Sequence, residues 1–158
     1  MEHERVRDSQ QQADCRLRIP TAESSAALPR HRTIRVLVVD DHPLMRQGLK
    51  RFLQGEPDIE VVGEAADGKL AVDLVGELQP DIVTMDINMP VMDGIEATRQ
   101  IRTAWPAVRV IALSMFNTTD YAAIMKEAGA AAYLVKASAA DLLVAVIREC
   151  NNPNAAGY

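Results

Sequence analysis

From residue 34 onward, short apolar runs alternate with longer stretches in which apolar residues recur every three or four positions. The first run, IRVLVV, is almost entirely aliphatic and is followed by two acidic residues. Short runs that are rich in β-branched residues and bounded by Asp, Gly or Pro are typical of buried strands. The pattern predicts five strands, at residues 34–39, 59–66, 81–85, 108–114 and 132–135.

The stretches that follow these strands have helical periodicity. Helices are predicted at residues 43–57, 69–78, 94–104, 120–130 and 138–150. The side chains predicted to face the core are Met45, Leu49, Phe52 and Leu53 in the first helix, Leu70, Leu74, Val75 and Leu78 in the second, and Ile95, Thr98 and Ile101 in the third. Pro43 suits a first helical turn, Gly129 suits a helix end, and Ser138 with Asp141 forms a capping signature for the last helix.

Strands that alternate with helices favour an α/β fold in which a parallel sheet is covered by helices on both faces. The strands of such a sheet are apolar along their whole length, and all but the second run comply. The crossover connections are expected to be right-handed. The chain has 158 residues, of which 48% are hydrophobic and only 4% aromatic, so one domain with an aliphatic core is predicted at residues 34–150.

The two ends of the chain differ from this domain in composition. Residues 1–33 contain six Arg and five acidic residues without sustained periodicity, and are predicted to form a flexible extension. Residues 151–158, NNPNAAGY, are predicted to be a linker-like tail. From residue 34 onward, the chain contains eleven Lys and Arg and seventeen Asp and Glu. This excess of negative charge argues against non-specific nucleic-acid binding and is compatible with a cation site.

Cysteine content and hydropathy indicate the setting. Cys15 and Cys150 lie near opposite ends of the chain and suggest neither a metal site nor a disulfide framework, which favours a reducing, cytoplasmic environment. No apolar run approaches the roughly 18 residues that a membrane span needs. The N-terminus lacks the pattern of a signal peptide, so no membrane association is expected.

Reactive side chains follow the predicted strands at their carboxyl ends, where open α/β sheets bind ligands. They are Asp40 and Asp41 after the first strand, Asp86 after the third, Ser114 at the end of the fourth and Lys136 after the fifth. Carboxylates held close together repel one another, and a divalent cation that prefers oxygen ligands, such as Mg²⁺, would relieve this repulsion. Asp41 and Asp86 could supply carboxylate ligands and Asn88 a backbone carbonyl. Lys136 and Ser114 could pair with phosphoryl oxygens, so the set suits phosphoryl transfer to a carboxylate.

Four segments that contain these residues resemble the receiver domain of bacterial two-component response regulators, over about residues 33–150. They are VLVVDDHPLMRQGL, DIVTMDINMPVMDGIEA, VIALS and AAYLVKA. The DDHPLMRQGL version resembles the NarL/FixJ (LuxR-type) class of DNA-binding regulators. The resemblance implies a flavodoxin-like (βα)₅ fold with a doubly wound, parallel five-stranded sheet. It also implies a signalling domain rather than an enzyme, one that catalyses only its own Mg²⁺-dependent phosphorylation and its dephosphorylation.

The resemblance further implies a role for each matching residue. Asp86 would be the phosphoacceptor, Asp41 and Asp86 the direct Mg²⁺ ligands with Asp40 in support, Asn88 a ligand through its carbonyl, Lys136 the lysine of the site, Ser114 and Tyr133 the switch pair, and Pro90 and Gly94 the residues that shape the loop after the acceptor. A sensor histidine kinase is the implied donor, and phosphorylation is expected to favour a homodimer. DNA binding is expected only through an output domain that is absent from this chain, so a fragment that ends in a linker is favoured over a stand-alone receiver.

Two other classes of function remain open. A metal-dependent phosphohydrolase with an aspartate nucleophile would need an acid two residues later, where Asn88 cannot transfer a proton. A pseudo-receiver that acts only as an interaction module should lack one of the acids or the lysine, and none of them is missing. Simpler structural interpretations apply to some residues: Asp81 and Asp93 as caps of a turn or helix, His42 as a solvent-facing residue at a helix start, and Tyr133 as a packing residue.

Overall fold

The structure is a computed structural model that describes residues 32–154. Its elements, in chain order, are β1 (Ile34–Val39), α1 (Pro43–Gln54), β2 (Ile59–Ala65), α2 (Gly68–Leu78), β3 (Ile82–Asp86), α3 (Gly94–Ala104), β4 (Arg109–Ser114), α4 (Thr119–Ala128), β5 (Ala132–Val135) and α5 (Lys136–Asn151). Except for Arg32 and Thr33, the predicted extension at residues 1–33 lies outside the described residues, and so does the last part of the predicted tail.

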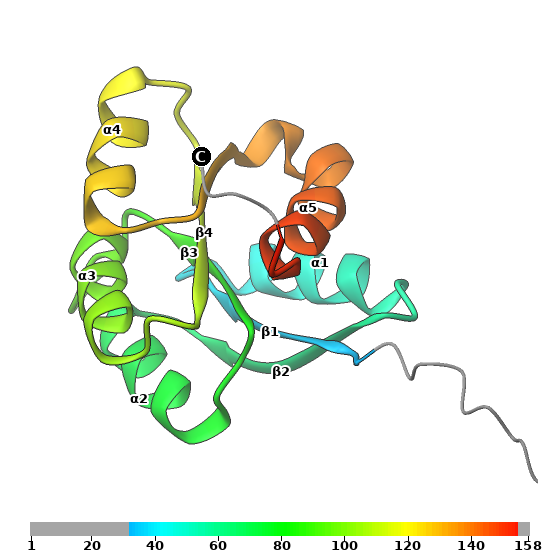
Figure 1. Cartoon of the computed structure of the whole chain (residues 1–158). Helices are drawn as coiled ribbons and strands as arrows, with labels where there is room; N and C mark the ends of the chain where they lie inside the picture. The colour runs from blue at the N-terminus through cyan, green and yellow to red at the C-terminus, as the bar shows by residue number, and fades with distance from the viewer. Residues whose placement is uncertain (1–31, 155–158) are drawn as a thin grey trace, which may run out of the picture. The chain divides into compact units, whose positions relative to one another are not determined.

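The five strands form one parallel sheet in the order β2-β1-β3-β4-β5 (Figure 1). All four neighbouring pairs are parallel. The strand order reverses between β1 and β3, so the connections after these two strands run in opposite directions. Such a reversal creates a crevice at the carboxyl ends of the two strands. The predicted α/β fold with a doubly wound sheet is confirmed.

Helices cover both faces of the sheet, with α1 and α5 on one face and α2, α3 and α4 on the other (Figure 1). Strand residues point alternately to the two faces, so β1 contributes to two separate core layers. Val36 and Val38 pack with residues of α1 and α5. Leu37 and Val39 pack with residues of α2 and α3. The central strands β1 and β3 are thereby buried on both faces, and this packing fixes the positions of their carboxyl ends.

Two side chains that were predicted to face the core are exposed. Phe52 in α1 is 38% exposed, whereas Leu49 and Leu53 are buried. Leu70 in α2 is 41% exposed, and the smaller Ala71 takes the buried position instead. Adjacent helical positions differ by about 100° around the axis, so a wide apolar stripe does not determine which of its edges faces the sheet.

The predicted capping signature of the last helix is wrong. Helix α5 begins at Lys136, directly after β5, and its N-cap residue Val135 makes no side-chain capping bond. Ser138 lies inside the first turn, where its hydroxyl donates a hydrogen bond to the Val135 carbonyl at 3.1 Å. Since strand and helix adjoin without a loop, the backbone turns at Val135 and brings Lys136 to the edge of the sheet.

The two aspartates that were interpreted as caps differ in outcome. Asp93 is the N-cap of α3, and its carboxylate accepts a hydrogen bond from the Glu96 N–H at 2.8 Å. Asp81 instead accepts the N–H of Arg35 at the start of β1, 2.9 Å away. The prediction is confirmed for Asp93, whereas Asp81 ties two neighbouring strands together rather than capping a turn.

Thr84 in β3 offers a test of the core. Its side chain is fully buried, and its hydroxyl has no hydrogen-bonding partner within the described residues. Because an unsatisfied buried hydroxyl costs about 1–3 kcal/mol, Thr84→Val is expected to raise the free energy of unfolding by about 1 kcal/mol in denaturant titrations. Thr98 is the control, since its equally buried hydroxyl donates to the Gly94 carbonyl at 2.6 Å. Thr98→Val should destabilise the protein, and equal effects of both variants would contradict the interpretation.

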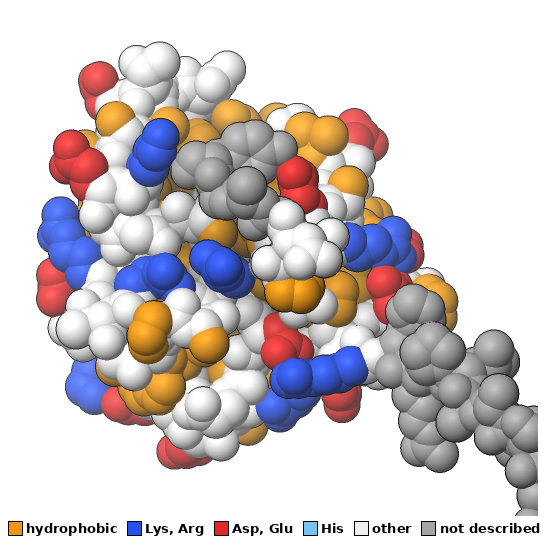
Figure 2. All heavy atoms as spheres, viewed as in Figure 1, with side chains coloured by type: hydrophobic (Ala, Val, Ile, Leu, Met, Phe, Trp, Pro, Cys, Tyr) orange, Lys and Arg blue, Asp and Glu red, His pale blue; other side chains and the backbone are white. Residues whose placement is uncertain are grey.

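Charged side chains of both signs are interspersed with apolar ones on the face seen in Figure 2, and neither sign covers that face. The net charge of −5 is therefore not gathered into one acidic patch on this side. Over the part of the chain that the structure describes, none of the helices has the length and apolar character needed to cross a bilayer.

Candidate functional site

Three aspartates meet at the carboxyl ends of β1 and β3, as the sequence predicted. Asp40 directly follows β1, and Asp86 is the last residue of the neighbouring β3. Asp40 is fully buried and Asp86 is 4% exposed, while the side chain of Asp41 is 27% exposed. Carboxylate oxygens of these residues and a ring nitrogen of His42 all lie within 4.8 Å of one another. The crevice at the strand reversal therefore holds a concentrated negative charge.

Lys136 joins this cluster from the end of β5. Its side chain is only 4% exposed, and its Nζ atom lies 2.6 Å from Asp40 Oδ2 and 3.1 Å from Asp86 Oδ1. One ammonium thus faces two buried carboxylates, and Asp41 adds a third negative charge. The cluster keeps an excess of negative charge that a cation could balance.

The buried environment shifts the pKa values of the central pair. Burial raises the pKa of the Asp86 carboxyl above its usual 3.8, and the nearby charge of Asp40 adds to this, while Lys136 opposes it. Burial alone would lower the pKa of Lys136, but the hydrogen bond to Asp40 and the charge of Asp86 outweigh it and raise the pKa above 10.5. Lys136 is therefore positively charged at neutral pH, and Asp86 is a more basic carboxylate than an exposed one.

Asp41 supplies a direct reason to expect a metal ion. Its Oδ1 atom is buried and accepts no hydrogen bond within the described residues, although His42 Nδ1 lies 2.8 Å away. Buried carboxylate oxygens are normally paired or bound to metal ions. The donor set is made of the hard oxygen ligands that Mg²⁺ prefers. The residues present therefore fit a divalent cation beside Asp41 and Asp86.

The loop between β3 and α3 is closely packed against the end of β3. The Gly94 N–H donates to the Ile87 carbonyl at 2.8 Å, which folds the loop back over the strand end. Pro90 starts a tight turn in which the Met92 N–H donates to its carbonyl, and Val91 adopts a φ of 69°. Asn88 lies in this loop two residues beyond Asp86, with an exposed side chain.

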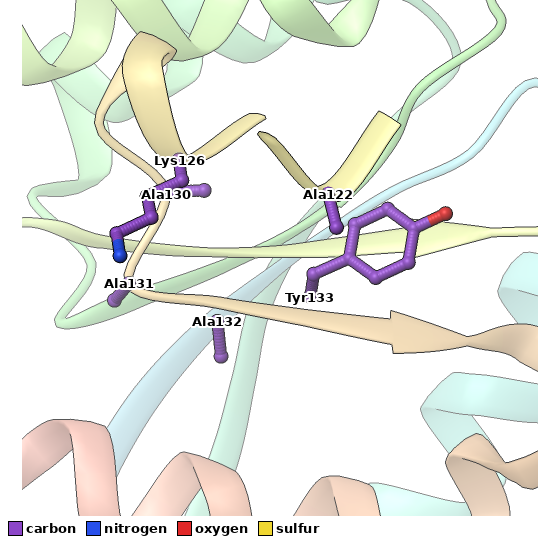
Figure 3. A pocket seen from close by; sticks show the side chains of 6 residues that line it. All are labelled: Ala122, Lys126, Ala130, Ala131, Ala132 and Tyr133. Atoms are coloured by element: carbon purple, nitrogen blue, oxygen red, sulfur yellow. The ribbon is translucent and has the colours of Figure 1, made fainter. Parts of the chain in front are cut away.

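Ser114 and Tyr133 are linked to each other, and among the described residues neither makes a hydrogen bond to the carboxylate cluster. The buried Ser114 hydroxyl accepts a hydrogen bond from the Phe116 N–H at 3.1 Å. The Tyr133 hydroxyl donates to the carbonyl of the same Phe116 at 2.6 Å. Figure 3 shows the Tyr133 ring beside Ala122 of α4, at one end of a pocket of about 210 Å³ between α4 and β5. Ser114 and Tyr133 therefore form a second group, which is connected through the backbone of Phe116.

Sequence reasoning did not find three contacts of the acidic residues. The Arg46 guanidinium donates to the Asp40 carbonyl at 2.6 Å, and the Ile87 N–H donates to Asp86 Oδ1 at 2.9 Å. The His42 N–H donates to Asp40 Oδ1 at 2.8 Å. The sequence signal for the last contact was that His42 directly follows the acidic pair in the chain. The prediction that the His42 side chain faces solvent is confirmed, since 71% of it is exposed.

The fold and site define a class of α/β domain with an acidic crevice and a buried lysine. Residues 36–148 match the response regulator receiver domain, and the chain belongs to this family. It is 48% identical over 115 residues to the transcriptional regulatory protein LiaR of Bacillus subtilis (strain 168). The aligned region covers 73% of this chain and 54% of LiaR. It is also 42% identical over 115 residues to the transcriptional regulatory protein DegU of Brevibacillus brevis. The aligned region covers 73% of this chain and 49% of DegU.

A solved structure agrees with these relatives. The two-component response regulator of the LuxR family from Aurantimonas sp. SI85-9A1 is 41% identical, with a TM-score of 0.72, over 75% of this chain and 85% of that chain. The predicted resemblance to the NarL/FixJ (LuxR-type) class is confirmed. The chain spans about half the length of the curated relatives it matches.

Proposed function

We propose that this receiver domain accepts a phosphoryl group on Asp86 in a Mg²⁺-dependent reaction and then changes conformation to control an output. The observation that carries the proposal is the arrangement around Asp86. Lys136 lies 3.1 Å from Asp86 Oδ1, and the buried Asp41 Oδ1 accepts no hydrogen bond from the described residues, with the exposed ring of His42 2.8 Å away. An acceptor, a fixed cation and a place for a second cation are the parts that phosphoryl transfer requires.

The two oxygens of Asp86 have different environments. Oδ1 accepts the Ile87 N–H and contacts Lys136, which leaves Oδ2 to attack the phosphorus atom. An O–P bond forms at Oδ2 while the bond between phosphorus and the leaving group of the donor breaks, and the leaving group keeps that electron pair. Lys136 then pairs with a phosphoryl oxygen. A bound Mg²⁺ would neutralise phosphoryl charge, held by Asp41, Asp86 and the Asn88 carbonyl with Asp40 in support.

The proposed switch uses the second group of residues. Ser114 would leave the Phe116 N–H to donate its hydroxyl hydrogen to a phosphoryl oxygen on Asp86. Since Phe116 also holds the Tyr133 hydroxyl at 2.6 Å, a movement of Ser114 would shift Tyr133 and the surface formed by α4 and β5. Phosphorylation would thus bias a surface that lies outside the crevice.

A sensor histidine kinase is the proposed donor. Four exposed apolar side chains follow β1, β3 and β4 in the chain, on the side of the sheet where these strands end: Leu44 in α1, and Val91, Met115 and Phe116 in the loops after β3 and β4. Exposed apolar side chains near a polar site favour docking of a protein partner.

The proposal has three further parts. The phosphorylated form is a homodimer, its output is in transcription through a separate DNA-binding module, and its location is cytoplasmic. LiaR and DegU are named as transcriptional regulatory proteins.

Intact-protein mass spectrometry after incubation with acetyl phosphate tests the proposal. With Mg²⁺ present, the chain is expected to gain one phosphoryl group. When a chelator removes Mg²⁺, the adduct should be absent, because the negative charge of the cluster would then repel the phosphoryl donor. If no adduct forms although Mg²⁺ binding is confirmed by calorimetry, the chain is a pseudo-receiver and the proposal is wrong.

Lys136→Met is expected to slow formation of this adduct by about 100-fold, because the ammonium that pairs with the phosphoryl group is lost. Mg²⁺ affinity should stay the same or rise, since a competing cation has been removed from the acidic cluster. Initial rates from mass spectrometry and Mg²⁺ titrations by calorimetry measure the two effects. Lys69→Met is the matched control, because Lys69 is exposed and pairs with Asp73 of its own helix. Equal rates for the two variants would exclude the proposed role of Lys136.

A further inference from the structure

The pocket between α4 and β5 has no occupant in the proposed function. Its volume is about 210 Å³, and it is lined by residues of these two elements and of the connection between them: Ala122, Lys126, Ala130, Ala131, Ala132 and Tyr133 (Figure 3). Alanine occupies four of these six positions, so short side chains leave space between the helix and the strand. An apolar cavity of about 150 Å³ is large enough for benzene. This pocket therefore has room for one aromatic ring with a small substituent.

Tyr133 provides an aromatic wall at one end of the pocket. Figure 3 shows its ring beside Ala122. Its hydroxyl donates to the Phe116 carbonyl at 2.6 Å, so the ring is held in place and the hydroxyl hydrogen already has an acceptor. Two aromatic rings attract each other in offset-stacked or edge-to-face arrangements. This end of the pocket therefore suits an aromatic group better than a polar one.

Lys126 provides the charge of the pocket. It lies in the last turn of α4, its side chain is exposed, and Figure 3 shows its nitrogen away from the Tyr133 ring. Residues three and four positions from Lys126 could reach it along the helix, but none of them is acidic: Ala122, Ala123, Gly129 and Ala130. Within the part of the chain that the structure describes, the Lys126 ammonium takes part in no ion pair or hydrogen bond. The pocket thus offers an unpaired cation to an anionic group.

We infer that this pocket binds a small aromatic carboxylate, with its ring against Tyr133 and its carboxylate on the Lys126 ammonium. The bound ring holds Tyr133 in the position seen in the structure. Because phosphorylation is proposed to shift Tyr133, the ligand favours the unphosphorylated chain and opposes phosphorylation of Asp86. This regulatory part rests on the proposed function, whereas binding itself does not.

Titration of the isotope-labelled full chain with benzoate, followed by nuclear magnetic resonance, tests binding. The amide signals of Lys126 and of residues 130–133 should shift and saturate, with a dissociation constant on the order of 1 mM. Lys126→Met should weaken benzoate binding about fivefold, because an exposed ion pair is lost, and should change the affinity for neutral benzyl alcohol by less than about twofold. Lys69→Met is the matched control, since Lys69 pairs with Asp73 in α2, and it should bind benzoate like the wild type.

Ala122→Leu tests the location of the ligand. Leucine is a good helix former, and its side chain would fill the end of the pocket beside Tyr133. Benzoate and benzyl alcohol should both bind at least about tenfold more weakly to this variant, with the remaining amide signals in their wild-type positions. Equal benzoate affinity of the wild type and of either Ala122→Leu or Lys126→Met would overturn the inference. It would also be overturned if benzoate up to about 20 mM shifted none of the pocket signals.

The yield of the phosphoryl adduct with acetyl phosphate and Mg²⁺ tests the coupling to Tyr133. Saturating benzoate should lower this yield at least about twofold in the wild type, and Lys126→Met should need about five times as much benzoate for the same effect. An unchanged yield although benzoate is bound would overturn the regulatory part. A wild type that forms no adduct even without benzoate would contradict the proposed function, while saturable binding in the pocket would still support the ligand site.

Discussion

Asp86→Asn is expected to form no phosphoryl adduct with acetyl phosphate and Mg²⁺, while keeping the wild-type fold. An amide is a poor nucleophile and carries no negative charge for a cation, yet it has the same shape as the carboxylic acid. Because the Asp86 side chain is 6% exposed and held by Ile87 and Lys136, the amide can occupy the same space. Intact-protein mass spectrometry measures the loss directly.

Asp93→Asn is the matched control for this variant. Asp93 lies in the loop between β3 and α3 and caps α3 through the Glu96 N–H, outside the carboxylate cluster. Asparagine is an equally good N-cap residue, so this variant should fold and accept a phosphoryl group like the wild type. An adduct on Asp86→Asn, or a loss of the adduct on Asp93→Asn, would contradict the assignment of the acceptor.

The pKa of Asp86 predicts how the same variant affects stability. Burial raises this pKa above 3.8 in the folded protein, so the folded state binds the proton more tightly than the unfolded state does. The stability that Asp86 contributes is thus fully present below pH 3.8 and is lost as pH rises through the raised pKa. At pH 7 the ionised carboxylate opposes folding, and asparagine avoids this cost. Denaturant titrations should show Asp86→Asn to be at least as stable as the wild type at pH 7, with a smaller advantage at acidic pH.

Gly94→Ala is expected to destabilise the protein by at least about 3 kcal/mol or to prevent folding, which is a large part of the usual stability of a domain. A Cβ atom at this position would lie 2.0 Å from the Asp86 carbonyl oxygen and 3.0 Å from Ile87 Cα. These are backbone atoms of β3 and of the loop that follows it, so no side-chain rotation can relieve the overlap. Denaturant unfolding followed by circular dichroism measures the effect, and a change below about 1 kcal/mol would contradict the close packing of this loop.

Gly48→Ala is the control for this substitution. Gly48 lies in the middle of α1, and a Cβ atom there would meet nothing within 4 Å. Because alanine is the better helix former, this variant should be more stable than the wild type by about 0.5–1 kcal/mol. The two glycines thus predict effects of opposite sign, which a general sensitivity to Gly→Ala changes would not produce.

The sequence predicted the fold because strands and helices in this chain have sharp chemical boundaries. The bounds of β1 and β5 agree with the predicted runs at residues 34–39 and 132–135. Phe52 and Leu70 were misplaced because each lies at the edge of an apolar stripe, where packing against the sheet decides which neighbour is buried. The start of α5 was misplaced because no turn residue separates it from β5, although such residues are the usual signal for a boundary.

The site was predictable as a group of residues but not in its contacts. Parallel strands end at the same edge of a sheet, so Asp40, Asp86 and Lys136 could be expected to meet. Which carboxylate Lys136 approaches more closely depends on side-chain conformation, and in the structure it is Asp40 at 2.6 Å. The 2.8 Å contact of His42 with Asp41 could not be predicted either, because a histidine at a helix start has no fixed orientation in the sequence pattern.

Chemical reduction of the phosphorylated chain tests the central claim most directly. Borohydride converts an aspartyl phosphate into homoserine in two steps. A first hydride displaces phosphate from the activated carbonyl and leaves an aldehyde, and a second hydride reduces this aldehyde to the alcohol, whereas free carboxylates do not react. After incubation with acetyl phosphate and Mg²⁺, peptide mass spectrometry should locate homoserine at position 86 and at no other aspartate. Homoserine at Asp40 or Asp41, or an adduct that resists reduction, would contradict the account of Asp86 as the phosphoacceptor.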